Sequence, residues 1–397
     1  LSDSLSESMI KACEEVMEGK FDDQFPIDMI QGGAGTSTNM NANEVIANRA
    51  LELMGHKKGE YEHCSPNDHV NMSQSTNDAY PTSSQLSLIR LHTEFIEHLK
   101  LLIVAFRAKG EEFSDVIKMG RTQLQDAVPM TLGQEFNAFA NNLAKEVDHL
   151  AYSANFFNEV NMGATAIGTG LNAAPGYAQA CVKHLCRITG YPIVLAKDLV
   201  EATPDTGAYV AYSSALKSLA IKLSRICNDL RILSSGPRTG FNEINLPPMQ
   251  PGSSIMPGKV NPVIPEVVNQ ICFRVIGNDT TVTMGSEAGQ MQLNVMEPII
   301  AYAVMESVQF LKQGVDVLRI KCVSGITANR ERCAEMVKNS IGIVTALNPF
   351  IGYNNSSRIA KMAQESGRGV YELVLEEKLL SKDKLDDVLS PENMIGK

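Results

Sequence analysis

The chain has 397 residues, a formal net charge of −10 and a pI of about 5.3. Apolar residues make up 44% of it and charged residues 20%, which is the balance of a globular, soluble protein. The negative charge argues against nucleic acid or an anionic membrane as the main partner, and the sequence has no apolar run near the ~18 residues that span a bilayer.

Residues 1–76 are expected to form an N-terminal domain with a short helix or two, the glycine-rich turn 32–35 and several polar turns. The chain begins Leu-Ser-Asp, without an initiator Met or a signal peptide. We therefore expect this domain to be truncated.

Residues 77–331 are expected to form a central bundle of long helices. Apolar residues recur there at the 3–4 spacing of one helical face in five stretches, namely 86–106, 132–157, 216–233, 264–282 and 299–318. Helices of roughly 25–35 residues would be about 40–50 Å long. Strands and helices do not alternate, so the predicted fold class is all-α.

The second and third of these stretches carry apolar residues on more than one face, as at Ala140, Ala144 and Ala220. A helix that is buried on several sides needs several partners, and we infer that some belong to other subunits. A thick core within one monomer is the alternative. Residues 332–397 are expected to form a small C-terminal helical domain with an acidic tail at 382–387.

Four polar clusters lie at breaks between the helical stretches, at residues 35–41, 73–78, 120–127 and 252–262. Ser, Thr and Asn at a helix start most often serve as N-caps. Together, however, the four clusters offer many hydroxyls and amides and only two basic side chains. This combination favours a site that binds carboxylates, with its positive potential supplied locally.

The fourth cluster reads Gly-Ser-Ser-Ile-Met-Pro-Gly-Lys-Val-Asn-Pro. Its glycines and prolines break any helix or strand and leave backbone N–H groups free to face an anion. Between them stand the hydroxyls of Ser253 and Ser254, the cation Lys259 and the amide of Asn261. A flexible surface connector is the plainer alternative.

Other chemistries lack their motifs. The eight cysteines include no Cys-x-x-Cys pair, so we expect free thiols in a reducing cytoplasm. The seven histidines show no ligand pair at helical spacing beside a carboxylate, so no metal site is expected. No Walker loop, dinucleotide fingerprint or Gly-x-Ser-x-Gly elbow is present, and the glycines of 162–172 have the wrong spacing.

The run 252–262 resembles the signature loop of the fumarase/aspartase superfamily, and the whole chain resembles the aspartate ammonia-lyases (aspartases) from end to end. The resemblance implies all-α homotetramers in which each active site draws on loops from three subunits. It implies cytoplasmic enzymes that reversibly deaminate L-aspartate to fumarate and ammonia. Members carry a further stretch before the position of Leu1, which fits the unusual start of this chain.

A fumarase, by the same resemblance, would carry His where this chain has Gln123 and Ser65. Both differences point away from hydration of fumarate and towards ammonia chemistry. A fumarate hydratase remains the alternative, and so does a non-catalytic structural protein on the lyase fold. All four clusters are intact, which argues against the latter.

The resemblance also implies roles for individual residues. Ser253 would be the base that removes the Cβ proton, acting as an alkoxide. The remaining positions would bind the substrate: Thr36, Ser75 and Thr76 with the backbone of Ser254 at the β-carboxylate; Lys259, Asn261 and Thr122 at the α-carboxylate; Asn77 and Gln123 at the amino group. No organic cofactor is required, and a divalent cation is expected at most as an activator.

Overall fold

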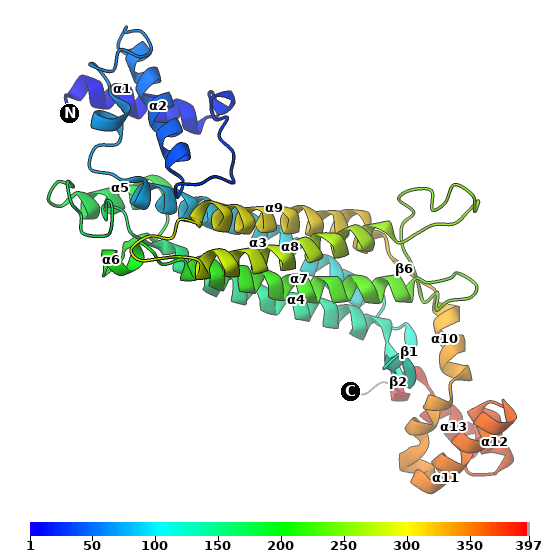
Figure 1. Cartoon of the computed structure of the whole chain (residues 1–397). Helices are drawn as coiled ribbons and strands as arrows, with labels where there is room; N and C mark the ends of the chain where they lie inside the picture. The colour runs from blue at the N-terminus through cyan, green and yellow to red at the C-terminus, as the bar shows by residue number, and fades with distance from the viewer. Residues whose placement is uncertain (395–397) are drawn as a thin grey trace. The chain divides into compact units, whose positions relative to one another are not determined.

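The computed structural model describes residues 1–394 and divides into two compact units (Figure 1). Unit 1 consists of Leu1–Ile96, Asp148–Ala220 and Phe273–Leu311. Unit 2 consists of Glu97–Val147, Ile221–Cys272 and Lys312–Lys397. None of the helices within residues 1–394 is both long and apolar enough to cross a bilayer.

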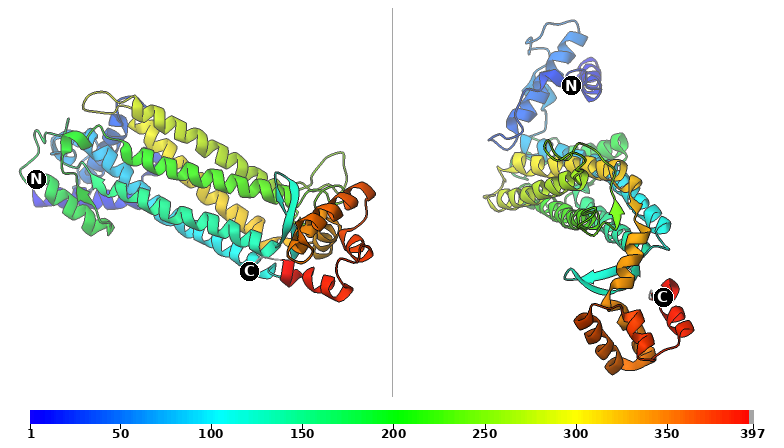
Figure 2. Two further views of the ribbon diagram at one scale, coloured as in Figure 1. Left: turned by 90° about the horizontal axis from the view of Figure 1, so that it is seen from below. Right: turned by 90° about the vertical axis from the view of Figure 1, so that its right-hand side faces the viewer.

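Five long helices dominate the chain, and each contributes a part to both units. Within each unit, parts of these helices run side by side in all views (Figures 1 and 2). They are α3 (Thr76–Glu112), α4 (Leu132–Ala154), α7 (Gly207–Leu233), α8 (Val263–Glu287) and α9 (Glu297–Lys321). The predicted all-α fold with long helices is therefore confirmed. Their apolar faces supply the core, with Phe95, Phe106 and Leu223 among the fully buried side chains.

Unit 1 also holds two helices near the N-terminus that pack on each other through Leu5, Ala12 and Leu51. The pair β3–β4 is parallel and only two residues long. The further elements of this unit are α1 (Asp3–Met17), η1 (Asp22–Gln24), α2 (Thr36–Leu53), η2 (Pro66–Val70), η3 (Asn155–Asn158), β3 (Glu159–Val160), α5 (Tyr177–Thr189), β4 (Val194–Leu195) and α6 (Leu199–Ala202).

Unit 2 contains an antiparallel hairpin of β1 (Ile117–Thr122) and β2 (Gln125–Thr131), which the helical periodicity did not predict. The small pair β5–β6 and a set of short helices complete the unit, with a core around Leu347, Ile359 and Leu373. These elements are β5 (Ile244–Asn245), η4 (Val323–Gly325), β6 (Thr327–Ala328), α10 (Arg330–Asn339), η5 (Ile341–Ile343), α11 (Val344–Ser366), α12 (Val370–Glu376), α13 (Lys382–Val388) and α14 (Pro391–Met394).

The predicted domain boundaries stay a prediction. Helix α3 begins at Thr76 and α10 at Arg330, close to the expected limits of the central bundle. The boundary between the compact units, however, cuts across the five long helices, so that each unit holds a part of every one. It does not separate the bundle from its flanks.

Candidate active site

The second polar cluster forms the start of α3. Ser75 caps the helix: its Oγ accepts the backbone N–H of Asn77 at 3.2 Å, and its own N–H donates to Asp78 Oδ1 at 2.9 Å. Thr76 is buried, and its Oγ1 accepts a hydrogen bond of 3.1 Å from Asn39 Nδ2 of α2. Capping therefore accounts for part of this cluster, and it fixes the hydroxyls in place.

Asp78 ties the same turn to the glycine-rich segment 162–172. Its fully buried Oδ2 accepts the N–H groups of Gly163 at 3.1 Å and Thr165 at 2.9 Å. Burial raises the pKa of Asp78, and these backbone donors oppose that shift. The Asn77 amide donates to the carbonyl of Ala166 at 2.7 Å. The segment that superficially resembles a dinucleotide loop is thus a structural support for the start of α3.

Thr36 is the first residue of α2 and is exposed. Its Oγ1 donates to the carbonyl of Gly33 at 2.8 Å. Gly35 before it has a φ of +88°, and a Cβ there would lie 2.6 Å from the Tyr80 ring of α3. Glycine is therefore required where α2 begins, because the backbone passes directly over a buried aromatic side chain.

The third cluster lies at the tip of the β1–β2 hairpin. Thr122 pairs with Gln125, and the two residues between them, Gln123 and Leu124, have φ of 55° and 60°. Positive φ at both positions defines a tight hairpin turn that normally takes Asn or Gly. A residue other than glycine costs about 1–3 kcal/mol of backbone strain in this left-handed conformation. The turn holds the Gln123 side chain exposed at the hairpin tip.

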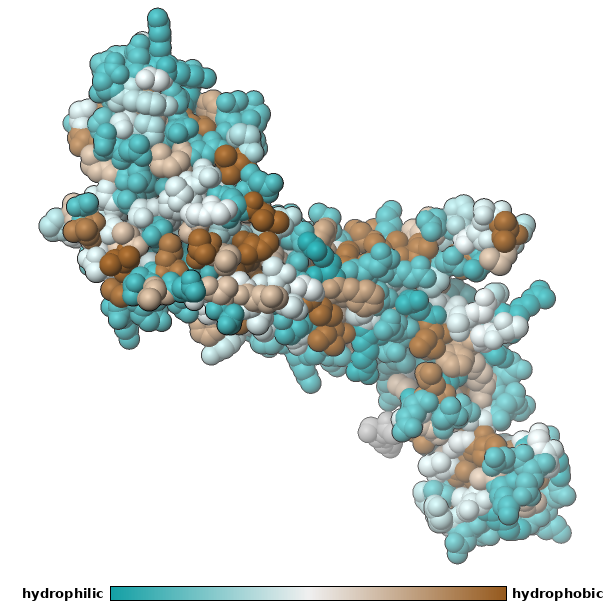
Figure 3. Space-filling model, viewed as in Figure 1, coloured by the Kyte–Doolittle hydropathy of each residue, from teal (hydrophilic) through white to brown (hydrophobic). Residues whose placement is uncertain are grey.

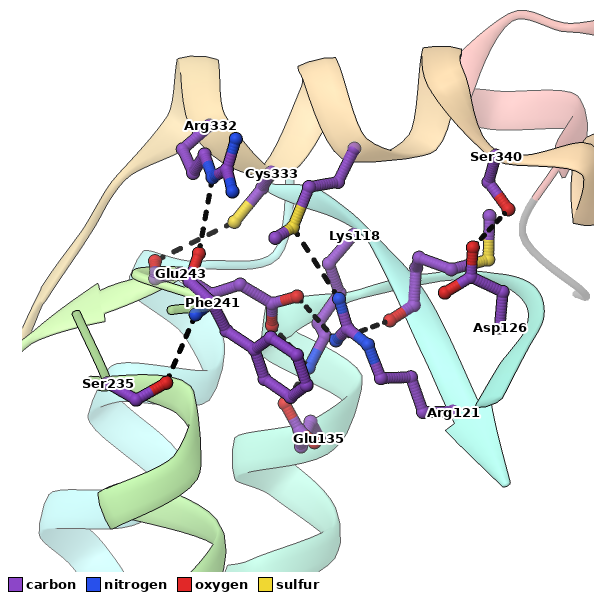
Figure 4. Close-up of polar contacts among 12 residues, drawn as sticks. Lys118, Arg121, Asp126, Glu135, Ser235, Phe241, Glu243, Arg332, Cys333 and Ser340 are labelled. Atoms are coloured by element: carbon purple, nitrogen blue, oxygen red, sulfur yellow. Dashed lines mark hydrogen bonds and ion pairs between the residues drawn. The ribbon is translucent and has the colours of Figure 1, made fainter. Parts of the chain in front are cut away.

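A buried ionic network anchors strand β1 of this hairpin (Figure 4). Glu243 is fully buried and accepts contacts from Lys118 Nζ at 2.8 Å and Arg121 Nη1 at 2.6 Å. Lys118 also contacts Glu135 at 2.6 Å, and the Arg121 guanidinium stacks 4.2 Å from the centre of the Phe241 ring. Burial by itself lowers the pKa of Lys118, but the two carboxylates outweigh it and raise that pKa. The sequence alone did not predict this network.

The fourth cluster forms a loop that is closed at its neck. The N–H of Gly252 donates to the Lys259 carbonyl at 2.8 Å, and the Asn261 amide donates to the Gly252 carbonyl at 2.8 Å. A Cβ on Gly252 would lie 2.2 Å from that Lys259 oxygen. Only glycine allows the two backbone segments of the neck to approach this closely.

Within this loop, the Ser253 Oγ accepts the backbone N–H groups of Ile255 at 3.2 Å and Met256 at 3.1 Å. Hydrogen bonds to the oxygen of a hydroxyl favour its deprotonated form. Ser253 is half-buried, whereas Ser254 is exposed. The local geometry thus gives Ser253 a donor pair suited to an alkoxide.

A hollow of about 1260 Å³ lies between this loop, the end of α7 and residues 234–246. Lys259 and Asn261 line it, whereas Ser253 and Ser254 do not. Among the described residues, its lining contains the basic side chains Arg231 and Lys259 and no carboxylate. In a chain of net charge −10, this is the local positive environment that an anionic ligand needs.

Comparison with known proteins identifies the family. A family described as "Lyase" matches residues 2–277, and one described as "Fumarase C C-terminus" matches residues 343–396. An aspartate ammonia-lyase of Pseudomonas aeruginosa is 64% identical over 97% of this chain and 82% of its own length. That of Escherichia coli is 58% identical over 99% of this chain and 82% of its own length. This chain belongs to the aspartate ammonia-lyases of the fumarase/aspartase superfamily.

Solved structures agree with this placement of the lyase. The fumarate lyase:delta crystallin from Brucella melitensis bound to cobalt has a TM-score of 0.97 and 51% identity, covering 100% of this chain and 86% of that one. A class II fumarase from Schistosoma mansoni has a TM-score of 0.93 and 37% identity, covering 99% of this chain and 86% of that one. The fold is therefore shared across the superfamily.

The structure of the lyase places the expected site residues in two groups. Thr36, Ser75, Thr76 and Asn77 belong to unit 1, where Asn39 of α2 bonds to Thr76 of α3. The other positions belong to unit 2, on the hairpin tip and on the 252–262 loop: Thr122, Gln123, Ser253, Ser254, Lys259 and Asn261. Their roles at a bound substrate stay predictions.

One group of potential metal ligands was not predicted from the sequence. His56, Glu60 and His63 follow α2, and their ligand atoms lie within 4.8 Å of one another. His56 Nδ1 is 3.3 Å from Glu60 Oε2, and the two imidazole rings stack with centres 3.9 Å apart. These residues lie on a turn rather than on a helix, so the pattern of a ligand pair at helical spacing does not describe them, and the expectation of no metal site stays a prediction.

Proposed function

We propose that this lyase deaminates L-aspartate reversibly to fumarate and ammonia. The observation that carries the proposal is the sequence identity of this chain to relatives named aspartate ammonia-lyase. The identity is 58–64% over nearly the whole length of this chain, to relatives from Pseudomonas and Escherichia. The basic hollow beside the 252–262 loop supports it, since the substrate carries two carboxylates. The test is to add L-aspartate to the purified protein and to measure fumarate and ammonia, which should appear in equal amounts.

The difficult step is removal of a proton from Cβ, next to a carboxylate that is already negative. The aci-carboxylate that forms carries a second negative charge on its oxygens, so preorganised donors must surround them. Hydroxyls and backbone N–H groups do this without neutralising a nearby base. We assign the β-carboxylate to Thr36, Ser75 and Thr76 with the Ser254 backbone.

Ser253 is proposed as the base. A serine hydroxyl removes a carbon-bound proton only as its alkoxide, which needs stabilisation by fixed donors. The N–H groups of Ile255 and Met256 that face its Oγ support this role. The loop would close over the substrate during turnover.

Lys259, Asn261 and Thr122 are assigned to the α-carboxylate, and Asn77 and Gln123 to the amino group. An amide can hydrogen-bond an ammonium group without adding a competing charge, whereas an imidazole at position 123 would suit the hydroxyl of malate. Gln123 thus favours the ammonia-lyase over the fumarase alternative.

Replacing Lys259 by Ala is expected to raise KM for L-aspartate more than it lowers kcat. The reason is that it removes one of the two basic side chains lining the hollow. A charge-assisted hydrogen bond contributes about 1.5–3 kcal/mol, so KM should rise about 10- to 100-fold. Steady-state kinetics of Lys259→Ala and Lys259→Arg would show it, and an unchanged KM in Lys259→Ala would remove Lys259 from the binding site.

A homotetramer with composite active sites is proposed on the basis of the surface of α8. Phe273 and Met284 lie on one side of this helix as a stripe and are 62% and 67% exposed, and Val267, further round the helix, is 40% exposed. Gly277 lies on the same stripe, and a Cβ there would meet nothing within 4 Å in its own chain. Apolar side chains reach the surface along the helical part in Figure 3. A long helix with an apolar outer face is typical of a buried subunit interface.

Phe273→Glu is expected to dissociate this assembly, because it places a charge in the middle of the apolar stripe. Light scattering should report a smaller species, and activity should fall in parallel, since each site needs loops from more than one subunit. Glu287→Gln, at the exposed end of the same helix, is the control. A fully active monomer would contradict the composite site.

No organic cofactor is proposed for the reaction. If a divalent cation activates the enzyme, the turn of His56, Glu60 and His63 is the place among the described residues that offers three ligands together. We further propose a cytoplasmic location, since the eight cysteines are all free. Absence of turnover on both L-aspartate and L-malate would favour a non-catalytic structural role.

A further inference from the structure

A second hollow, of about 500 Å³, lies in unit 1 beside the N-terminal parts of α3, α7 and α9. In contrast to the basic hollow of unit 2, its lining in the described chain includes four acidic residues and no Lys, Arg or His. The acidic residues are Glu159, Glu201, Asp205 and Glu297. None of these four residues is among those proposed to bind L-aspartate.

Glu297 is the buried member of this set. It is the first residue of α9 and is 5% exposed. Its Oε2 is enclosed and accepts no hydrogen bond from the described residues. Asn294 holds the preceding turn, since its Oδ1 accepts the Met296 N–H at 2.9 Å and its amide donates to the Gly285 carbonyl at 3.1 Å. Burial without a cationic partner raises the pKa of Glu297 to about 8.

Gln85 of α3 supplies a second acceptor. Its Nε2 donates to the backbone carbonyl of Glu159 at 3.1 Å, which fixes the orientation of the amide. Its Oε1 is enclosed and has no hydrogen-bond partner among the described residues. Two oxygens beside the hollow, one of a carboxyl group and one of an amide, therefore lack donors among the described residues.

We propose that this hollow binds a protonated amine, whose ammonium group donates to Glu297 and Gln85. An ammonium group has several N–H donors, which suit the two unpartnered oxygens. It also has a positive charge, which suits the acidic lining. A chelated metal ion fits less well, because the acidic residues here do not form a set of three ligand atoms within 4.8 Å, unlike His56, Glu60 and His63. The volume is that of a small-molecule site.

An occupant of this hollow would adjoin the start of α3. Asn161 lines the hollow, and its amide donates to the backbone carbonyl of Asn77 at 3.0 Å. The ammonium group could come from free ammonium ion or from an organic amine. The binding experiment that follows separates these sources and involves no turnover, so its failure would leave the proposed deamination untouched.

Isothermal titration of the full, assembled protein with 1,4-diaminobutane and, separately, with ammonium chloride tests the proposal. We expect saturable binding of at least one probe to the wild type, and of both if free ammonium ion suffices. Glu297→Gln keeps the shape of the side chain but cannot become the carboxylate that balances a bound ammonium group, and should weaken binding about 10- to 100-fold. Glu287→Gln, which carries the same charge change outside the hollow, should bind as the wild type does.

Gln85→Lys provides a second variant that places an ammonium group of the chain itself beside Glu297. It should abolish binding of both probes and raise the melting temperature, because the buried carboxylate then gains its cation. Failure of the wild type to bind either probe saturably would overturn the proposal. Equal affinity of Glu297→Gln and wild type would overturn it as well.

Discussion

Ser253→Ala is expected to lower kcat for L-aspartate by at least about 10²–10⁴-fold, the usual contribution of a general base. The variant should keep its fold and its assembly, because the Ser253 hydroxyl bonds only to N–H groups of its own loop among the described contacts. Steady-state kinetics and circular dichroism of wild type and variant would measure both properties.

Ser254→Ala is the matched control for this experiment. The Ser254 side chain is exposed, and its assigned contribution is the backbone N–H, which Ala keeps. Its kcat should therefore stay close to that of the wild type. Ser254 is the base if Ser254→Ala is inactive while Ser253→Ala retains about a tenth or more of the wild-type kcat, which is far more activity than loss of a general base should leave. If both remain active, the loop serves only as a lid.

The second large effect is on stability. Glu243→Gln should destabilise the protein by about 3–5 kcal/mol, the usual cost of removing one partner from a buried ionic network. Lys118 and Arg121 are both largely buried, and the variant removes the carboxylate that balances their positive charges. Thermal melting followed by circular dichroism would show the loss as a lower melting temperature.

The control for Glu243→Gln is Glu376→Gln. Glu376 pairs with Arg368 at 2.6 Å, but its side chain is 56% exposed. Exposed ion pairs contribute about 0–1 kcal/mol, so this variant should melt close to the wild type. Equal losses in both variants would show that burial does not determine the strength of the Glu243 network.

The long helices could be predicted because their cores repeat at short range in the sequence. Phe95, Leu99 and Phe106 mark the buried face of α3, and all three are fully buried. The β1–β2 hairpin could not be predicted in this way. Its strands are short, Gly120 and Pro129 interrupt them, and its turn uses Gln123 and Leu124 where a hairpin normally has Asn or Gly.

The candidate site divides in the same way. The polar clusters lie within short runs, so the Ser75 cap and the closed 252–262 loop could be read from neighbouring residues. The network of Lys118, Arg121 and Glu243 joins positions more than 100 residues apart, as its Arg121–Glu243 hydrogen bond shows. Glu297 stands alone in the sequence, and only the folded chain reveals that its carboxylate is buried without a partner.

The ratio of kcat/KM for L-aspartate to that for L-malate tests the central claim most directly. Both substrates yield fumarate, so one ultraviolet assay measures both reactions on the same preparation. The assignments of Gln123 and Ser253 predict rapid fumarate formation from L-aspartate, one ammonia for each fumarate, and little turnover of L-malate. Comparable kcat/KM on L-malate would contradict the deamination and identify the protein as a fumarate hydratase.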